Sequence, residues 1–285
     1  MKVLVTGSSG MLGSDLLNIL SRKGYDTFGL DHRNGDITDL KKVRKVVNEF
    51  RPDTVVHCAA YTDVVGCEKD PDKAFKVNGL GTKNMAISCQ EVGASMVYIS
   101  TDYVFDGEKK RPYNELDNPD PINVYGRSKL LGEYYVQHLL NRFSIIRTSW
   151  MFGRNGKNFV DTILTLFKKE DTLQIVDDQA GSPTLSKELA SNVGEVIERA
   201  GNGIYHVTNS ATCSWYEFAT RVVQLADLKG KTVEPTDSET LKRPKNSALE
   251  NRLFRLEEYG LLRPWEEALM EHLNEVKSTE HGGRC

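Results

Sequence analysis

The sequence has no apolar run approaching the roughly 20 residues that span a bilayer. Its start, with one lysine and then a strand-like run at 2–6, is not typical of a signal peptide. Basic residues are not in excess, because 37 Lys and Arg against 40 Asp and Glu give a net charge of -3. This balance argues against nucleic acid as the main partner. We therefore expect a globular protein without a membrane segment.

Cysteines are few and scattered, and no C-x-x-C occurs. A disulfide framework is expected to use an even number of cysteines, and a zinc site closely spaced pairs. The sequence predicts neither, and we expect reduced thiols in a cytoplasmic protein. The five cysteines are Cys58, Cys67, Cys89, Cys213 and Cys285.

The first half of the chain alternates short apolar runs with longer segments of helical spacing. The short runs are continuous rather than alternating, as strands buried on both faces require. This rhythm predicts an α/β fold, a Rossmann-type doubly wound parallel sheet with ligands at the carboxyl ends of its strands. The expected strands are 3–6, 27–30, 54–57, 96–99 and 144–147, and the expected helices are 12–20, 40–50, 71–91 and 124–140.

After about residue 150 the rhythm loosens. We expect residues 1–150 to form the dinucleotide-binding domain, and most of 151–285 to form a smaller substrate-binding lobe interleaved with it. The polar stretch 229–246 contains two prolines and is expected to be loop. The expected helices here are 159–168, 187–199, 214–226 and 265–276, and the expected strands are 173–176 and 204–207.

A glycine-rich loop lies between the first expected strand and the first expected helix. In that context Gly7 permits a tight turn, Gly10 lets the backbone approach a pyrophosphate, and Gly13 allows close packing of helix and sheet. The free N–H groups and the dipole of the helix start favour an anion. We expect the loop, including Met11 and Leu12, to bind a dinucleotide, although its G-x-x-G-x-x-G spacing is one residue longer than the commonest fingerprint.

Residues after the second expected strand bear on the choice of dinucleotide. Asp31 ends that strand, where an acidic residue holds the adenosine ribose in NAD-specific sites. His32 and Arg33 follow, and Arg33 could instead pair with a 2′-phosphate. The two signals conflict, so the sequence leaves NADH and NADPH as alternatives.

Two further pairs are expected to touch the cofactor. Asp36 and Ile37 could flank the adenine by polar contact and apolar packing, or Asp36 could cap the helix that follows. Ala59 and Ala60 end the third expected strand, where small side chains would let a cofactor pass over the sheet edge. Plain packing explains these two alanines equally well.

Tyr125 and Lys129 are four residues apart in an expected helix, which places both side chains on one face. Reduction of a carbonyl needs a proton donor at the forming alkoxide. A free tyrosine, with a pKa of about 10, is a poor donor near neutrality, and a nearby ammonium should lower that pKa. Lys129 could also hydrogen-bond the nicotinamide ribose. Thr101, at the end of the fourth expected strand, could donate to the carbonyl oxygen.

These motifs together resemble the dTDP-4-dehydrorhamnose reductase family, within the extended short-chain dehydrogenase/reductases. The resemblance covers nearly the whole chain, and its most specific part is the Ser-Thr-Asp-Tyr-Val-Phe-Asp-Gly block. The blocks that carry it are residues 7–13, 100–107, 123–129, 147–150, 181–184 and 243–247.

The resemblance implies a catalytic triad of Thr101, Tyr125 and Lys129, with NADPH or NADH as cosubstrate. The reaction would be reduction of the C4 ketone of dTDP-4-dehydro-L-rhamnose, and the indole of Trp150 could stack on the sugar. The chain departs from the family at 65–68, beside the sugar pocket, so the exact sugar is less firmly implied. The implied deoxysugar pocket contains Thr62, Val64, Asp102, Tyr103 and Trp150.

Other assignments fit the same motifs. A related nucleotide-sugar reductase or epimerase would share them, and so would a regulatory subunit resembling the beta subunit of methionine adenosyltransferase. Some members carry a metal between paired subunits, but Asp15 and Glu188 at comparable positions are too few to predict an ion. We therefore expect a nucleotide-sugar substrate, no metal, and a possible homodimer.

Overall fold

The computed structural model describes residues 1–238 and 242–282 of the chain, and Cys285 lies outside them. Its centre is a parallel sheet of six strands in the order β10-β5-β4-β3-β1-β2. Most of the expected apolar runs are its buried strands, and only the edge strand β2 is largely unburied. The predicted fold class is confirmed. The strands are β1 (Lys2–Thr6), β2 (Asp26–Leu30), β3 (Thr54–His57), β4 (Ser95–Thr101), β5 (Phe143–Thr148) and β10 (Gly203–His206).

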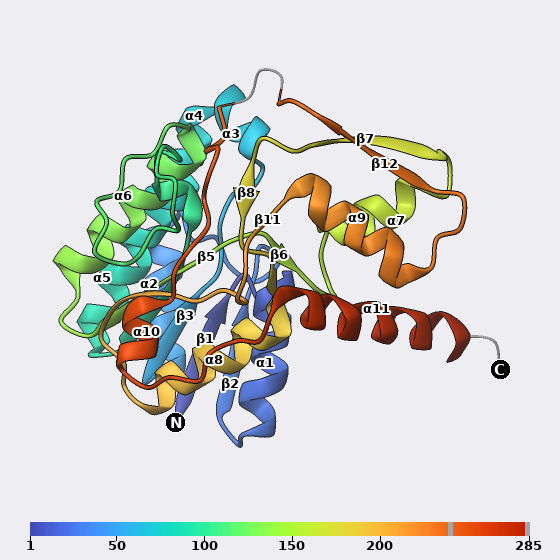
Figure 1. Cartoon of the computed structure of the whole chain (residues 1–285). Helices are drawn as coiled ribbons and strands as arrows, with labels where there is room; N and C mark the ends of the chain where they lie inside the picture. The colour runs from blue at the N-terminus through green and yellow to red at the C-terminus, as the bar shows by residue number, and fades with distance from the viewer. Residues whose placement is uncertain (239–241, 283–285) are drawn as a thin grey trace.

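Helices cover both faces of this sheet (Figure 1). On one face, α1 (Met11–Arg22) buries Leu12, Leu16 and Leu20 at four-residue spacing, and α8 (Ser186–Glu198) packs beside it. The other face carries α2 (Leu40–Phe50), α5 (Thr82–Val92) and α6 (Val124–Leu139). Between α2 and α5 the chain forms α3 (Val64–Lys69), α4 (Pro71–Ala74) and a π-helix, Phe75–Gly81.

The strand order reverses direction between β1 and β3. From β1 the chain first adds β2 on one side and then crosses to β3 on the other. Helices α1 and α3 therefore leave the sheet on opposite sides of this point, and a crevice opens at the carboxyl ends of the strands. The fold thus places a binding site beside residues 7–13 and 58–62.

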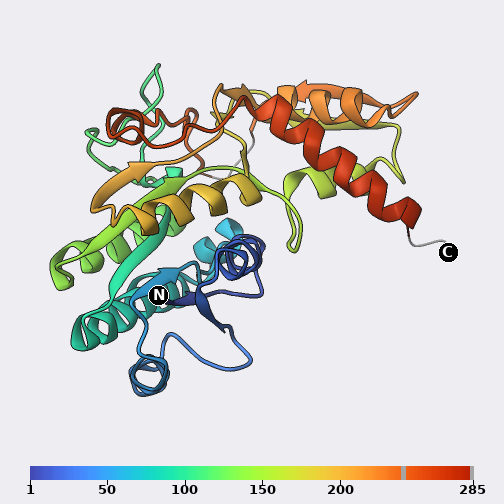
Figure 2. The ribbon, with the colours of Figure 1, turned by 90° about the horizontal axis from the view of Figure 1, so that it is seen from below.

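Much of the second half forms a separate lobe with its own core. Phe152, Phe218 and Trp265 are among its buried residues, and Figure 2 shows the lobe extending to one side of the sheet with α11 running outward. No described helix is long and apolar enough to cross a membrane. The lobe contains α7 (Phe159–Leu166), α9 (Trp215–Ala226), α11 (Trp265–Gly282), β6 (Met151–Phe152), β7 (Thr172–Val176), β8 (Ala180–Gly181), β9 (Thr184–Leu185) and β11 (Cys213–Ser214).

One prediction for this half was wrong in part. The stretch 229–246, expected to be loop, contains β12 (Thr232–Thr236), which pairs in parallel with β7. Pro235 lies within that strand. A two-stranded sheet has only edge strands, where a residue without an N–H is tolerated.

Candidate active site

A cavity of about 1120 Å³ lies at the carboxyl ends of β1, β3 and β4. It is large enough for two ligands side by side, since pockets for one small molecule usually measure about 300–1,000 Å³. Of the predicted site residues, only Arg33 and Lys129 are absent from its lining. Those that line it are Gly7, Gly10, Met11, Leu12, Gly13, Asp31, His32, Asp36, Ile37, Ala59, Ala60, Thr62, Val64, Thr101, Asp102, Tyr103, Tyr125 and Trp150.

The glycine loop is packed so closely that side chains are excluded. Gly7 has φ of 65°, and a Cβ added to it would lie 2.9 Å from the Ala59 nitrogen. A Cβ on Gly13 would lie 2.2 Å from the Gly7 oxygen. Gly10 is the N-cap of α1 and brings no capping side chain. The first N–H groups of α1 therefore face the cavity without a side-chain partner, which suits a diphosphate.

Asp31 and Arg33 pair with each other at the adenosine end. The Arg33 guanidinium donates to both carboxylate oxygens, with Nε 3.2 Å from Oδ1 and Nη2 2.5 Å from Oδ2. This hydrogen bonding holds the pKa of Asp31 well below its usual range. The Arg33 side chain is 74% exposed against 5% for Asp31, so Arg33 covers the carboxylate from the solvent side.

Asp36 and Ile37 both line the cavity, but Asp36 does not cap α2. Its Oδ1 accepts from the backbone N–H and the hydroxyl of Thr38, at 2.9 and 2.8 Å. The N-cap of α2 is Asp39, whose side chain accepts from Lys41 and Lys42. Capping is thus excluded as the role of Asp36, and the contact with adenine stays a prediction.

Lys129 lies beneath the cavity floor, buried at 2% exposure. Its Nζ donates to the Ile99 carbonyl at 2.7 Å and lies 4.1 Å from the centre of the Tyr98 ring. Burial lowers the pKa of Lys129 to about 7, and the nearby carboxylate of Glu133 partly opposes that shift. Near neutrality this amine is therefore poised between its charged and neutral forms.

Tyr125 is held at the cavity by α6, whose N-cap Asn123 accepts from the Gly126 N–H. Burial raises the pKa of its phenol above the ordinary value, while hydrogen bonding to Thr101 partly lowers it. The expected lowering of this pKa was therefore wrong in direction, because desolvation outweighs the favourable contacts. A phenol with a raised pKa is fully protonated near neutrality, the form that a proton donor needs.

Thr101 is hydrogen-bonded to the turn that follows β4. Its hydroxyl donates to Asp102 Oδ1 at 3.0 Å and accepts from the Tyr103 N–H at 3.2 Å. Asp102 begins a 3₁₀ turn, Asp102–Val104, directly after β4. The Tyr103 ring meets the Tyr125 ring edge to face, with centroids 6.0 Å apart.

Trp150 has a neighbour that the sequence did not reveal. Its indole stacks on Trp215 with ring centroids 3.5 Å apart and planes 7° apart, so one face of Trp150 is already covered. Its φ of 45° lies in the left-handed region. Trp215 and Phe159 also line the cavity, and their rings are 4.5 Å apart. The expected stacking of Trp150 on a sugar therefore leaves it only its other face.

Arg243 is a second residue that sequence reasoning missed. It lines the cavity, and its buried Nε has no hydrogen-bond partner among the described residues. It belongs to the Arg-Pro-Lys-Asn-Ser block, which carried the resemblance but was given no role. A half-buried cation at a ligand cavity is suited to an anionic ligand group.

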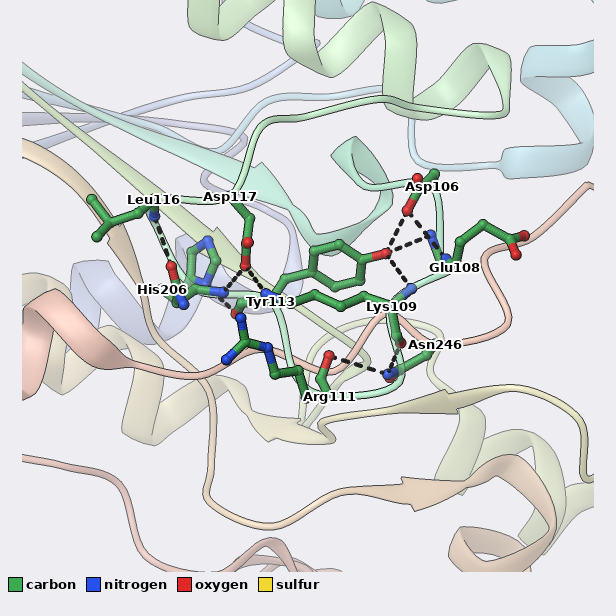
Figure 3. Close-up of polar contacts among 11 residues, drawn as sticks. Asp106, Glu108, Lys109, Arg111, Tyr113, Leu116, Asp117, His206 and Asn246 are labelled. Atoms are coloured by element: carbon green, nitrogen blue, oxygen red, sulfur yellow. Dashed lines mark hydrogen bonds and ion pairs between the residues drawn. The ribbon is translucent and has the colours of Figure 1, made fainter.

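The position of Arg243 depends on the loop after β4, drawn in Figure 3. Asn246 Nδ2 donates to the Lys109 carbonyl at 2.7 Å, and the Asn246 N–H donates to the Gly107 carbonyl. In the same loop the Tyr113 hydroxyl bonds to Asp106 and accepts from the Gly107 N–H. These contacts fix the segment that carries Arg243 against the N-terminal domain.

Residues 65–68, where the sequence departs from the family pattern, form most of α3. Val64 begins this helix and lines the cavity with Thr62. Glu68 accepts from the Val124 N–H at 2.7 Å, so it ties α3 to the start of α6 near Tyr125.

Asp15 and Glu188 are occupied by protein partners. Asp15 accepts from the Ser186 hydroxyl at 2.5 Å, and Glu188 pairs with Arg263 at 2.6 Å. Among the described residues no group of three or more His, Cys, Asp or Glu side chains is arranged to hold a metal ion.

Known proteins match this chain over nearly its full length. The family described as RmlD substrate binding domain matches residues 1–278. The spore coat polysaccharide biosynthesis protein SpsK of Bacillus subtilis is 43% identical, covering 97% of this chain and 98% of that protein. A dTDP-4-dehydrorhamnose reductase of Streptomyces griseus is 40% identical, covering 94% and 91%. The crystal structure of dTDP-4-dehydrorhamnose reductase from Bacillus anthracis in complex with NADP has a TM-score of 0.93 at 41% identity, covering 96% and 99%.

A doubly wound sheet whose glycine loop shares one cavity with Thr101 and Tyr125 is typical of the extended short-chain dehydrogenase/reductases. Within that class, the chain belongs to the RmlD substrate binding domain family, which includes dTDP-4-dehydrorhamnose reductases.

Proposed function

We propose that this chain is an NAD(P)H-dependent oxidoreductase that reduces the C4 ketone of dTDP-4-dehydro-L-rhamnose to give dTDP-L-rhamnose. The observation that carries the proposal is that one cavity joins the glycine loop to Thr101 and Tyr125. A dinucleotide held on the loop and a ketone beside the phenol would thus meet in one enclosure. Family membership supplies the class of substrate.

The residues fit a dinucleotide. The close approach of Gly13 to Gly7 leaves backbone rather than side chains at the start of α1, and the N–H groups there would hold the pyrophosphate. When bound, the nicotinamide supplies a hydride to the ketone carbon. Thr101 would donate a hydrogen bond to the ketone oxygen, and Tyr125 would give that oxygen its proton.

Specificity for the cosubstrate would be decided at the adenosine end. In NADH the free ribose hydroxyls would bond to Asp31, whereas the 2′-phosphate of NADPH would compete with Asp31 for Arg33. Arg33 is exposed and lies two residues from Asp31. Its guanidinium would therefore move only a short distance when it leaves the carboxylate for the phosphate. We propose that both cosubstrates are accepted.

Residues 1–150 would form the cosubstrate-binding domain, and most of 151–285 the smaller lobe beside the sugar. The sugar would contact Arg243 from the second part and, from the first part, Thr62, Val64, Asp102, Tyr103 and Trp150. We propose a cytoplasmic homodimer, to be checked by light scattering. All four described cysteines are unpaired, which fits a reducing compartment.

The decisive experiment follows the absorbance of NADPH, and separately of NADH, with enzymatically prepared dTDP-4-dehydro-L-rhamnose. Tyr125→Phe should lower kcat by about 10²- to 10⁴-fold and leave NADPH affinity unchanged, because only the proton donor is lost. Tyr134→Phe is the matched control, since Tyr134 lies on the same helix and is 54% exposed. Equal rates in the two variants would refute the role of Tyr125. Wild-type protein that binds NADPH but consumes none would refute the activity.

A further inference from the structure

One wall of the active-site cavity contains two stacked indoles, those of Trp150 and Trp215. Both indole N–H groups are buried and have no hydrogen-bond partner among the described residues. Hydrogen bonds therefore do not hold these rings, and their orientation depends on packing. The rings are parallel to within 7° at a centroid distance of 3.5 Å, closer than the roughly 4.5–7 Å of most aromatic pairs. Each ring thus fixes the plane of the other.

The backbone of Trp150 is held in an unfavourable conformation. Its φ of 45° lies in the left-handed region, which a residue with a large side chain adopts only when its surroundings enforce it. The Ser149 hydroxyl donates to the Ser182 carbonyl at 2.6 Å and accepts from the Ser182 N–H at 3.2 Å. The Thr184 N–H donates to the Trp150 carbonyl at 3.3 Å. These bonds fix the point from which the Trp150 ring projects.

The Trp150 ring lies directly on the backbone of Gly181. A Cβ added to Gly181 would lie 2.3 Å from Cε2 of the indole, so this position accepts no side chain. Gly181 belongs to β8, which pairs with β11 in a small antiparallel sheet, and β11 leads into α9 (Figure 1). Cys213 is the partner of Gly181 in that sheet, and Trp215 follows two residues later. The same sheet thus carries the glycine beneath one ring and places the other ring.

Trp215 is held in place by the lobe. It is the first residue of α9, whose N-cap Ser214 forms a capping box. Its ring lies 4.5 Å from the ring of Phe159, and Phe159 in turn stacks on the buried Phe218 at 5.5 Å between centroids. Trp215 is therefore a fixed surface that is backed by the core of the lobe.

We propose that Trp215 is a positioning residue for the sugar and acts through Trp150. This inference rests on the proposed function. With Trp215 behind it and Gly181 beneath it, the Trp150 ring has one face left to offer at the cavity, and a flat apolar surface suits the C–H face of a 6-deoxyhexose. Without Trp215 the Trp150 ring could tilt into the vacated space. The sugar would then have to order that ring on binding, which lowers its affinity.

A double-mutant cycle tests whether Trp215 acts through Trp150. The measured quantities are the KM for dTDP-4-dehydro-L-rhamnose and the Kd for the product, dTDP-L-rhamnose. Trp215→Leu should raise both by about 3- to 10-fold, the usual worth of one aromatic pair. Its effect on kcat should be smaller than its effect on KM, and the Kd for NADPH should not change. Trp215→Phe, which keeps an aromatic face, should recover most of the affinity.

In a protein that already carries Trp150→Leu, the replacement of Trp215 should matter little. The double variant should bind dTDP-L-rhamnose at most about twofold more weakly than Trp150→Leu alone, because the ring through which Trp215 acts is already gone. Effects that multiply would overturn the inference, since Trp215 would then act independently of Trp150. Tyr216→Leu is the matched control. It removes a half-buried ring from the next position of α9, outside the cavity lining, and should leave both constants unchanged.

A measurement on the wild-type protein does not depend on the folding of a variant. The chain has three tryptophans, and the third, Trp265, lies in the core of the lobe. Labelling with fluorotryptophan should therefore give three fluorine NMR signals. Addition of dTDP-L-rhamnose should shift the Trp150 signal most and the Trp265 signal least. A larger shift at Trp215 than at Trp150 would overturn the inference, because the sugar would then lie on Trp215 itself.

Failure of the proposed function gives a different pattern. A wild type that neither oxidises NADPH with dTDP-4-dehydro-L-rhamnose nor binds dTDP-L-rhamnose would overturn the proposed function and this inference with it. Multiplying effects of the two replacements, measured against an active wild type, would overturn this inference alone.

Discussion

Removal of one partner of the buried ion pair beneath the active site should destabilise the whole protein. Glu133 and Arg147 are 0% and 2% exposed, and they join α6 to β5. Arg147 donates to Oε1 at 3.0 Å and to Oε2 at 2.7 Å, and Ser100 donates to Oε1 at 2.5 Å. Glu133→Gln would leave the Arg147 charge buried without a counter-charge.

The expected loss is about 3–5 kcal/mol, the usual cost of leaving a buried charge unpaired. Domains are typically stable by about 5–15 kcal/mol, so the variant should fold but unfold at much lower urea concentration. The assay is urea unfolding followed by circular dichroism. Lys187→Met is the control, because its ion pairs with Glu271 and Glu275 are largely exposed and should contribute less than about 1 kcal/mol.

A double replacement, Glu133→Leu with Arg147→Met, should recover most of the lost stability, since it removes both charges from the core. If Glu133→Gln alone costs less than about 1 kcal/mol, water reaches the pair and our account of this core is wrong. The same variant should lower the pKa of Lys129 further, because the negative charge of Glu133 opposes the effect of burial on that pKa.

Two further predictions concern the cofactor loop and acid stability. Gly13→Ala should weaken NADPH binding at least tenfold in a titration, because the new Cβ would meet the Gly7 oxygen at 2.2 Å, whereas Gly194→Ala, with only Lys23 Nζ at 3.7 Å, should bind normally. Burial lowers the pKa of both His57 and His206 to about 3. Each stays neutral in the folded state while it gains a proton when unfolded, so stability should fall as pH drops below about 6.5, by up to about 1.4 kcal/mol per pH unit and histidine. Thermal melting across this range checks the sign, and an unchanged melting temperature between pH 7 and 5 would contradict it.

The parts of the fold that could be predicted are those where local pattern and burial agree. Strands β1, β3, β4 and β5 are mostly buried runs, whereas the edge strand β2 is only partly buried, and the glycine loop follows β1 directly. A strand was predicted at 204–207 and is β10 in the structure. Its pairing with β5 was not predicted, because strand pairing depends on contacts between residues far apart in the sequence. β12 was missed because its polar residues and Pro235 are typical of loop.

The candidate site shows the same division. Most residues of the motifs line the cavity, whereas Lys129 lies beneath its floor. Trp215 and Arg243 reach the cavity through packing of the lobe and of the segment at 242–249. The raised pKa of Tyr125 could not be predicted either, because the lysine spacing is visible in the sequence and the desolvation is not.

The position of β10 has a consequence for biosynthesis. The sixth strand of the sheet is synthesised some 55 residues after β5. The elements from β6 to α8 are synthesised between the two strands. Until residue 206 leaves the ribosome, β5 is an open edge whose unpaired N–H and C=O groups can pair with another chain. Arg243 and the segment that secures it follow later still. A nascent chain that stalls before residue 206 should therefore be prone to aggregate and should depend on chaperones.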